Sequence, residues 1–478
     1  MSSAQLPDRR ADWFSDEKPF VATGDQPPVR PNIVFVLADD MGWGDLGCYG
    51  SLHNSTPNLD ALAADGVRFE HAYATSPTCS PTRVSLYTGR YPGRLAVGLQ
   101  EPLLTRDSEH GIPPEHPTLP SLLKDSGYQT SMFGKWHCGW LPWFSPQRIG
   151  FETFFGNMDG VLDYYGHVDS TGTPDLYEGE EPVEVEGYYT DLLTDRAVGC
   201  IRDRDPERPF YMQVNYTAPH WPWETREDTE VSERITEAVG EEGMRALFHF
   251  DGGSLATYRE MVRILDEGVG KILAAIDDEG IRENTIVIFA SDNGGERYAF
   301  LWPFVGEKGD LEEGGIRVPN VIRWPAAIAP NGVTDVPIIT MDWTASLLDA
   351  AGVTPPESHP LDGMSLLPWL VGGAAEPDRA LYWRTSGQGA MRRGKYKLLH
   401  DRVAKPLWPH DDNFEGSRTR LFDVLSEGRE KADLSPEERD VAERMLSEWR
   451  EFDDSLMPYP SHEPELHPET GETTGFAD

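Results

Sequence analysis

The stretch that decides the fold is Ile33-Val34-Phe35-Val36-Leu37-Ala38, which ends at Asp39-Asp40. It is short, rich in β-branched residues and continuously apolar, as is typical of a strand buried on both faces of a parallel sheet. Residues 285–290 form a second such run, which ends at Ser291-Asp292-Asn293. Ligands of open α/β sheets bind beyond the carboxyl ends of the strands. We therefore expect the two polar clusters to meet at one edge of a sheet.

Two further apolar runs lead into polar residues in the same way. Residues 210–215 are followed by Ala218-Pro219-His220, and residues 129–133 by Gly134-Lys135-Trp136-His137. Helical patterns lie between the runs, and residues 255–277 place their apolar side chains on a single helical stripe. Alternating strands and helices predict an α/β fold with a large, mostly parallel sheet sandwiched by helices.

The residues Cys79-Ser80-Pro81-Thr82-Arg83 read as the start of another helix. Ser80 is a good N-cap, Pro81 suits the first helical position, and Gly89 is placed to end the helix. Cys79 is then expected just ahead of the helix N-terminus. Free backbone amides and the helix dipole favour an anion at that point.

The polar ends of the two central runs also carry a consistent set of metal ligands. Asp39, Asp40, Asp292 and Asn293 offer only oxygen atoms in useful number. Oxygen ligands suit a hard divalent cation better than zinc or copper. Calcium is the first choice, and magnesium remains an alternative that the sequence does not separate from it.

The pentapeptide resembles the C-x-P-x-R signature of the type I formylglycine-dependent sulfatases, members of the alkaline phosphatase superfamily. In that family the cysteine is oxidised to an aldehyde, formylglycine (3-oxoalanine). Other segments also resemble the family and follow in its order: residues 39–45, 88–92, 134–137, 218–220 and 314–319. The resemblance extends from Pro31 to Asp423 and so covers most of the chain.

The resemblance implies a role for each group of candidate site residues. It assigns the oxygen-rich side chains and the modified cysteine to the cation site: Asp39, Asp40, Cys79, Asp292 and Asn293. It assigns the basic side chains to the sulfate and to proton transfer: Arg83, Lys135, His137, His220 and Lys308. Cations and preorganised donors are what a sulfate ester with a developing negative charge needs.

The resembling enzymes also suggest a reaction path. The hydrated aldehyde attacks sulfur in line with the departing alcohol and forms a covalent sulfo-enzyme. His220, with Lys308 nearby, would protonate the leaving oxygen. His137 would take the proton from the second hydroxyl, which expels sulfate and restores the aldehyde.

The domain organisation follows from a change of pattern near residue 373. Residues 31–372 are predicted as the catalytic domain, with an alkaline-phosphatase-like sandwich implied by the resemblance. Residues 373–457 contain short strand candidates without helices between them. A helix follows, which opens with a capping-box pattern at Ser435 and runs to about Phe452. This part is expected to be a small antiparallel sheet with a helix. Residues 1–30 are an extension, and residues 458–478 a polar tail.

The composition limits which partners and which cellular location can be expected for the protein. The 478 residues carry a formal net charge of −39, which argues against nucleic acid and against a polybasic membrane patch as partners. The acidic excess suggests solvation at high salt, as in a halophile, and an ordinary acidic soluble protein is the alternative. Residues 1–30 show no apolar signal core, so a cytoplasmic location is expected unless an export signal precedes the sequence. The four cysteines make a disulfide framework improbable.

The expected activity is hydrolysis of an aryl or carbohydrate sulfate monoester, with a formylglycine-generating enzyme as the maturation partner. Tryptophans that lie near the motifs in sequence could stack on a sugar or aryl ring, or could simply pack in the core: Trp140, Trp143, Trp221, Trp223 and Trp302. Two other readings stay open. One is a phosphate or phosphonate ester hydrolase of the same superfamily, and the other is a binding protein with an inactive site.

Overall fold

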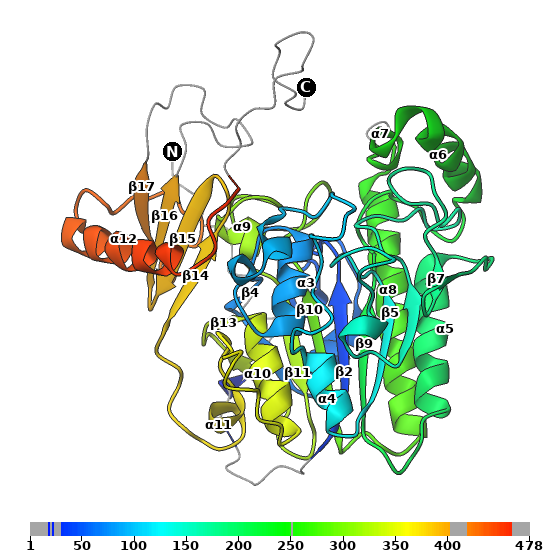
Figure 1. The fold of residues 1–478 in the computed structure, drawn as a ribbon. Helices are drawn as coiled ribbons and strands as arrows, with labels where there is room; N and C mark the ends of the chain where they lie inside the picture. The colour runs from blue at the N-terminus through cyan, green and yellow to red at the C-terminus, as the bar shows by residue number, and fades with distance from the viewer. Residues whose placement is uncertain (1–17, 20–21, 23–29, 250–251, 402–417, 461–478) are drawn as a thin grey trace.

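The computed structural model describes residues 18–19, 22, 30–249, 252–401 and 418–460 (Figure 1). The predicted N-terminal extension and C-terminal tail lie almost entirely outside the described residues. None of the described helices combines the length and the apolar character that crossing a bilayer requires.

In the described part of the chain, the main sheet contains eleven strands in the spatial order β1-β12-β3-β11-β10-β2-β9-β5-β6-β7-β8. The strands from β10 to β6 run parallel, while β11 is antiparallel to both of its neighbours and β7 and β8 form an antiparallel edge. The strand bounds are β1 Lys18–Pro19, β2 Asn32–Ala38, β3 Val67–Phe69, β5 Gln129–Gly134, β6 Thr153–Gly156, β7 Tyr177–Glu178, β8 Glu181–Pro182, β9 Phe210–Asn215, β10 Thr285–Ser291, β11 Asn320–Arg323 and β12 Gly332–Thr334. The predicted large, mostly parallel sheet is confirmed.

The register of the central strands brings their carboxyl ends to one edge. Ala38 of β2 pairs with Ser291 of β10, and Leu37 pairs with Asn215 of β9. Asn215 in turn pairs with Gly134 of β5. The residues that follow these strands therefore emerge side by side, as the sequence predicted.

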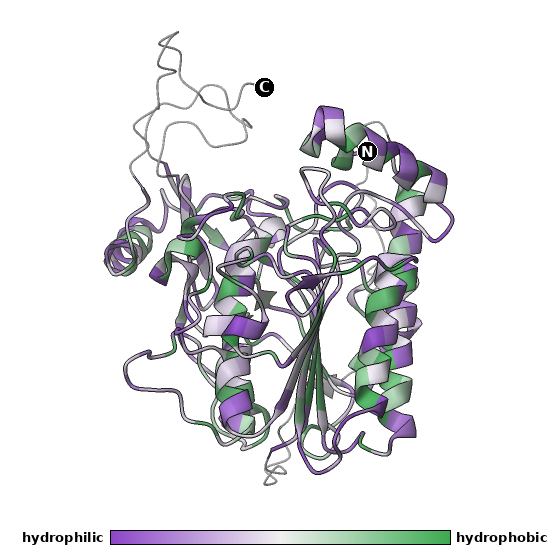
Figure 2. Cartoon of the chain, turned by 45° about the vertical axis from the view of Figure 1, so that its right-hand side comes forward, coloured by the Kyte–Doolittle hydropathy of each residue, from purple (hydrophilic) through white to green (hydrophobic). Residues whose placement is uncertain are grey.

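Helices cover both faces of the sheet, because successive residues of a buried strand point to opposite sides. Ile33, Phe35 and Leu37 of β2 belong to one core, and Val34 and Val36 to the other. Figure 2 shows the sheet between the two helical layers. The first core is covered by α3 (Cys79–Thr88), α4 (Leu119–Asp125), α10 (Met341–Ala350) and α11 (Leu367–Leu370). The second is covered by α2 (Pro57–Ala64), α5 (Tyr189–Arg202), α6 (Thr229–Glu242), α7 (Met244–Leu247) and α8 (Leu255–Asp278).

A smaller sheet, which is antiparallel throughout, lies beside this sandwich (Figure 1). It consists of β14 (Ala380–Arg384), β15 (Gln388–Arg393), β16 (Tyr396–Asp401) and β17 (Thr419–Asp423), and α12 (Arg439–Asp454) packs on it. The remaining elements are short: β4 Ala72–Tyr73 paired with β13 Ile338–Ile339, α9 Glu313–Ile316, and 3-10 turns at Gly47–Tyr49, Pro92–Arg94, Ala96–Leu99 and Gln147–Ile149. The predicted small sheet with one helix is confirmed.

The predicted capping box at Ser435 is wrong. The helix begins at Arg439, with Glu438 at the N-cap and no capping hydrogen bond from its side chain. The Ser435 amide donates to the Asp433 carboxylate at 2.9 Å, and its hydroxyl is 3.4 Å from the carbonyl oxygen of Thr419. Ser435 therefore fixes the turn against β17 instead of capping the helix.

Candidate active site

The predicted site residues meet at the carboxyl edge of the main sheet. Asp39 and Asp40 follow β2, Asp292 and Asn293 follow β10, and the remaining members come from the loops after β5, β9 and β10 and from the start of α3. Oxygen, nitrogen or sulfur atoms of Asp39, Cys79 and Asp292 lie within 4.8 Å of one another, as do those of Asp39, Asp40 and His220. Segments far apart in the sequence thus form one buried cluster.

The helix that carries Cys79 begins two residues earlier than expected. Cys79 is the first residue of α3, and Thr78 is at the N-cap without a side-chain capping bond. Ser80 does not cap the helix, because its hydroxyl accepts a hydrogen bond from the Leu103 amide at 2.7 Å. The end at Gly89 is confirmed, with a left-handed backbone at φ 67°. Burial raises the pKa of the Cys79 thiol.

Arg83 ties the start of α3 to the acidic residues. Its guanidinium donates to Asp292 Oδ2 through Nε at 3.0 Å and Nη2 at 2.8 Å, and Nη1 donates to the Lys135 carbonyl at 3.0 Å. Burial alone would lower the pKa of Arg83, but Asp292 and Asp39 outweigh burial and raise it. Arg83 is therefore a permanent cation inside the cluster.

Lys135 supplies a second buried cation. Its Nζ donates to Asp39 Oδ2 at 2.5 Å, and both side chains are fully buried. The Lys135 amide donates to the Asn215 carbonyl at 3.0 Å, and the Asn215 side-chain amide donates to the Lys135 carbonyl at 2.8 Å. These bonds to β9 hold the backbone of Lys135 in place while its ammonium contacts the Asp39 carboxylate.

His137 is held with a defined orientation beside Cys79. Its Nε2 is 2.8 Å from the carbonyl oxygen of Leu103, to which it must donate, so Nδ1 carries the lone pair. Nδ1 is 3.3 Å from the Sγ of Cys79. Burial, and then the charge of Lys135, lower the pKa of His137 well below its usual value. His137 is thus a neutral base aimed at residue 79, on a backbone in the left-handed region at φ 51°.

His220 and Lys308 form a second pair next to Asp40. The Nδ1 of His220 is 2.7 Å from the Trp221 carbonyl, so its Nε2 accepts from Lys308 Nζ at 3.1 Å. Lys308 Nζ also donates to Asp40 Oδ2 at 2.7 Å. Burial and Lys308 lower the pKa of His220, whereas for Lys308 the effect of burial is outweighed by Asp40 and the pKa is raised. Lys308 is the protonated member of the pair.

The oxygen-rich residues fit a hard cation. Among the described residues, Asp39 Oδ1 and Asn293 Oδ1 are buried atoms without a hydrogen-bond partner. Such atoms are costly unless they are paired or bind a metal. The amide nitrogen of Asn293 donates to Asp40 Oδ1 at 2.7 Å and to the Gly294 carbonyl at 2.9 Å, which orients its oxygen. Carboxylate and amide oxygens in a buried cluster match the preference of calcium or magnesium.

Sequence reasoning missed two groups that shape the site. The Leu103 carbonyl fixes the tautomer of His137, and no sequence pattern marks a backbone acceptor. Gly160 packs against the imidazole, because a Cβ built on it would lie 2.7 Å from Nε2 of His137. A glycine within the polar segment 157–160 was the only sequence signal for this contact.

The tryptophans divide into two groups. Trp140, Trp221 and Trp223 are buried and pack in the core or against Arg106, Phe248 and Tyr298. Trp143 is 41 % exposed and Trp302 is 55 % exposed. Only the latter two present a large exposed surface, whereas the Trp221 ring lies 4.2 Å from the His220 ring, centroid to centroid.

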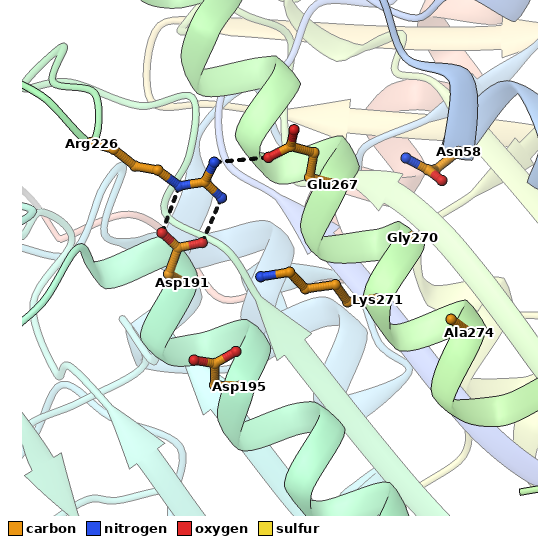
Figure 3. A pocket seen from close by; sticks show the side chains of 8 residues that line it. All are labelled: Asn58, Asp191, Asp195, Arg226, Glu267, Gly270, Lys271 and Ala274. Atoms are coloured by element: carbon orange, nitrogen blue, oxygen red, sulfur yellow. Dashed lines mark hydrogen bonds and ion pairs between the residues drawn. The ribbon is translucent and has the colours of Figure 1, made fainter. Parts of the chain in front are cut away.

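A polar groove elsewhere on the molecule carries different residues. Figure 3 shows it between α5 and α8, where Arg226 donates to Asp191 at 2.7 Å and to Glu267 at 2.8 Å. Its other lining residues are Asn58, Asp195, Gly270, Lys271 and Ala274. None of the predicted site residues lines this groove.

Comparison with known proteins decides the family. The sequence model of the sulfatase family matches residues 31–353. The chain belongs to the sulfatase family. The N-acetylgalactosamine-6-sulfatase of Canis lupus familiaris is 33 % identical over 397 residues, 77 % of this chain and 72 % of that protein. Arylsulfatase A of Homo sapiens is 34 % identical over 399 residues, 77 % of this chain and 74 % of that protein.

Solved structures agree with this assignment. The sulfatase chain superimposes on Ps i-CgsB in complex with k-i-k-neocarrahexaose with a TM-score of 0.76, at 28 % identity over 90 % of this chain and 94 % of the other. The phosphonate monoester hydrolase of Agrobacterium radiobacter shares the fold, with a TM-score of 0.61 at 20 % identity, over 89 % of this chain and 95 % of the other. The protein is an enzyme that hydrolyses sulfate esters.

Proposed function

We propose that this sulfatase cleaves a carbohydrate or aryl sulfate monoester with a formylglycine made from Cys79 by a formylglycine-generating enzyme. The observation that carries the proposal is the position of Cys79. Its Sγ is 3.3 Å from a neutral histidine nitrogen and within a cluster of buried carboxylates and cations. An unmodified thiol with a raised pKa would be a poor nucleophile there.

A divalent cation, calcium as first choice, would be held by Asp39, Asp40, Asp292 and Asn293 together with residue 79. Once formed and hydrated, the aldehyde would supply the nucleophile, and the bound cation would reduce the negative charge of the site. The two unpartnered oxygens, Asp39 Oδ1 and Asn293 Oδ1, support this set of ligands. Magnesium is the alternative ion.

We assign to His137 the proton transfer at residue 79. The bond from its Nε2 to Leu103 leaves Nδ1 free to accept a proton from a hydroxyl on residue 79. Its lowered pKa keeps the ring neutral, and therefore able to accept that proton, at neutral pH.

We assign to Lys308 and His220 together the protonation of the leaving oxygen. Lys308 is charged and donates to His220 at 3.1 Å, while His220 itself is neutral. Because Nε2 of His220 carries no proton of its own, the proton comes from the Lys308 ammonium, either directly or passed on through Nε2. A poor leaving group such as a sugar alcohol needs this proton most. The ammonium groups of Lys135 and Lys308 and the guanidinium of Arg83 would offset the charge of the sulfate and of the acidic residues.

The relatives are named for both sugar and aryl sulfates, and we favour a sugar sulfate because a similar solved structure is in complex with a saccharide. Similar proteins include an N-acetylgalactosamine-6-sulfatase and a structure in complex with a neocarrahexaose. A structure at 22 % identity is described in complex with D-glucosamine-2-N,6-O-disulfate, and it supports the fold alone. We therefore propose a sulfated saccharide as the substrate class.

The test compares nitrophenyl sulfate with nitrophenyl phosphate at equal concentration, using protein produced with a formylglycine-generating partner. We expect sulfate release to exceed phosphate release, and Cys79→Ala to abolish it. Preferred phosphate release would instead assign the protein to phosphoryl transfer. The absence of turnover on either ester by aldehyde-bearing protein would favour an inactive binding homologue.

A further inference from the structure

A buried ion cluster joins the C-terminal sheet to the main body of the molecule. Lys397 of β16 is fully buried, and its Nζ is 3.0 Å from Glu313 Oε1 and 2.8 Å from Glu430 Oε1. The Glu313 amide donates to Glu430 Oε2 at 2.6 Å. Glu313 is the first residue of α9, so a lysine and a glutamate of the C-terminal region hold the start of this short helix.

The cluster is charged and its members depend on one another. Burial alone would raise the pKa of Glu313, but Lys397 and then Arg317 outweigh it and hold the pKa well below its usual value. Glu313 Oε2 accepts from Tyr73 at 2.8 Å and from Arg317 at 3.1 Å. A buried carboxylate that loses one such partner is left with an uncompensated charge, which is strongly destabilising at that position.

From α9 the contacts lead directly to the catalytic loops. The Gly315 carbonyl accepts from the Gly294 amide at 2.8 Å, directly after Asn293. The Gly314 amide donates to the Val305 carbonyl at 2.7 Å, and the Lys308 amide to the Gly295 carbonyl at 3.1 Å. A Cβ on Gly314 or Gly315 would overlap backbone oxygens of the loop around Lys308. Packing of backbone against backbone leaves α9 little room to move without moving that loop.

A third contact ties α9 to the segment that precedes Cys79. The Ala74 amide donates to the Ile316 carbonyl at 2.7 Å, and the Gly309 amide donates to the Pro77 carbonyl at 2.9 Å. One short helix therefore touches the segments that carry Asn293, Lys308 and the nucleophile. Lys397 and Glu430 anchor its first residue from the C-terminal region, and Arg420 lies 3.6 Å from the Glu312 carboxylate just before it.

We propose that Lys397 is a positioning residue for catalysis, acting through Glu313 and α9 to place Lys308 beside His220. The C-terminal sheet would then complete the leaving-group side of the active site without contacting the substrate itself. The inference rests on the proposed function, because it assigns Lys308 to protonation of the leaving oxygen. It goes beyond that function in naming a residue outside the catalytic sandwich.

The test uses Lys397→Met, which removes the ammonium and keeps most of the aliphatic volume. The matched control is Lys395→Met in the turn before β16, where the lysine is half exposed and pairs with Asp423 at 3.0 Å. For each protein, kcat and KM are measured with nitrophenyl sulfate and with a sulfated sugar whose alcohol is a poor leaving group. Aldehyde content at residue 79 and the melting temperature are measured on the same samples.

We expect Lys397→Met to lower kcat on the sugar sulfate by roughly 10- to 100-fold, since a displacement of about 1 Å costs on that order. The loss on nitrophenyl sulfate should be at least several-fold smaller, and Lys395→Met should match the wild type on both esters. If Lys397→Met does not fold, Glu430→Gln decides the question, because it removes the second carboxylate that contacts Lys397 and keeps an oxygen for the Glu313 amide. It should show the same dependence on the leaving group at smaller amplitude.

Equal losses on both esters, or a lower melting temperature with unchanged kcat, would overturn the inference and leave Lys397 a purely structural residue. A wild-type enzyme that carries the aldehyde but releases no sulfate would refute the proposed function itself. The two failures are distinguishable because only the second involves the wild type.

Discussion

Replacement of Gly160 by alanine tests the orientation of His137 without changing any chemical group of the site. The added methyl would lie 2.7 Å from Nε2 and 2.9 Å from Nδ1 of the imidazole, and still closer to Cε1. Ordinary contacts of a Cβ with a neighbouring heavy atom start at 3.4 Å, so the ring must move. His137 is held on both sides, by Leu103 at 2.8 Å and Cys79 at 3.3 Å, so movement breaks at least one contact.

The expected magnitude follows from this geometry. Relief of the overlap requires a displacement of the ring on the order of 1 Å, and a displacement of that size at a catalytic group costs roughly 100-fold in rate. This corresponds to about 2.7 kcal/mol of activation free energy. Overpacking against the buried imidazole should also lower the melting temperature, by the equivalent of roughly 1–3 kcal/mol, so the rates are compared at a temperature at which both proteins are fully folded.

The assay is stopped-flow release of nitrophenol from nitrophenyl sulfate, with aldehyde content at residue 79 determined for each sample. If His137 acts only after the alcohol has left, Gly160→Ala should retain a burst of nitrophenol and lose the steady-state rate. The control is Gly199→Ala in α5, where a Cβ meets nothing within 4 Å. A wild-type steady-state rate in Gly160→Ala, or an equal loss in Gly199→Ala, would refute the role of His137.

Three further predictions concern the nucleophile, the cation and acid stability. Cys79→Ala should abolish turnover with little loss of the folded state, and substantial multiple turnover would exclude residue 79 as the nucleophile. Removal of divalent ions with a chelator should lower the melting temperature, and added calcium should restore it. This shift should be smaller in Asn293→Ala. A melting temperature that the chelator leaves unchanged would contradict the cation site. Burial, and then the charges of Arg317 and Arg392, lower the pKa of His71 in the folded protein to about 2. Below about pH 6.5 the histidine therefore binds a proton in the unfolded state but not in the folded state. The free energy of unfolding should therefore fall as the pH drops from 6.5 towards 2, less steeply in His71→Gln, and identical slopes in urea titrations would argue against a buried neutral His71.

The central sheet and the site edge could be predicted because both depend on local patterns. Continuous apolar runs identify β2 and β10, and the polar residues directly after them must emerge at the edge where parallel strands end. The helix start at Cys79 was missed by two residues because Ser80, a strong N-cap by type, is engaged by the Leu103 amide. A bond between residues 23 positions apart leaves no trace in a local pattern.

The links between distant segments could not be predicted for the same reason. Lys397 and Glu313 are 84 positions apart, and each alone resembles an ordinary surface charge in the sequence. The capping box at Ser435 failed because Asp433 and Thr419 bind that serine in the folded chain. Tertiary contacts override local preference at such positions.

The most direct test of a formylglycine nucleophile at residue 79 is mass spectrometry of the peptide that contains it, on samples with graded exposure to a formylglycine-generating enzyme. We expect the fraction of aldehyde at residue 79 and the rate of sulfate release to rise together, with no activity at zero aldehyde. Sulfate release by protein in which Cys79 is wholly unmodified would contradict it.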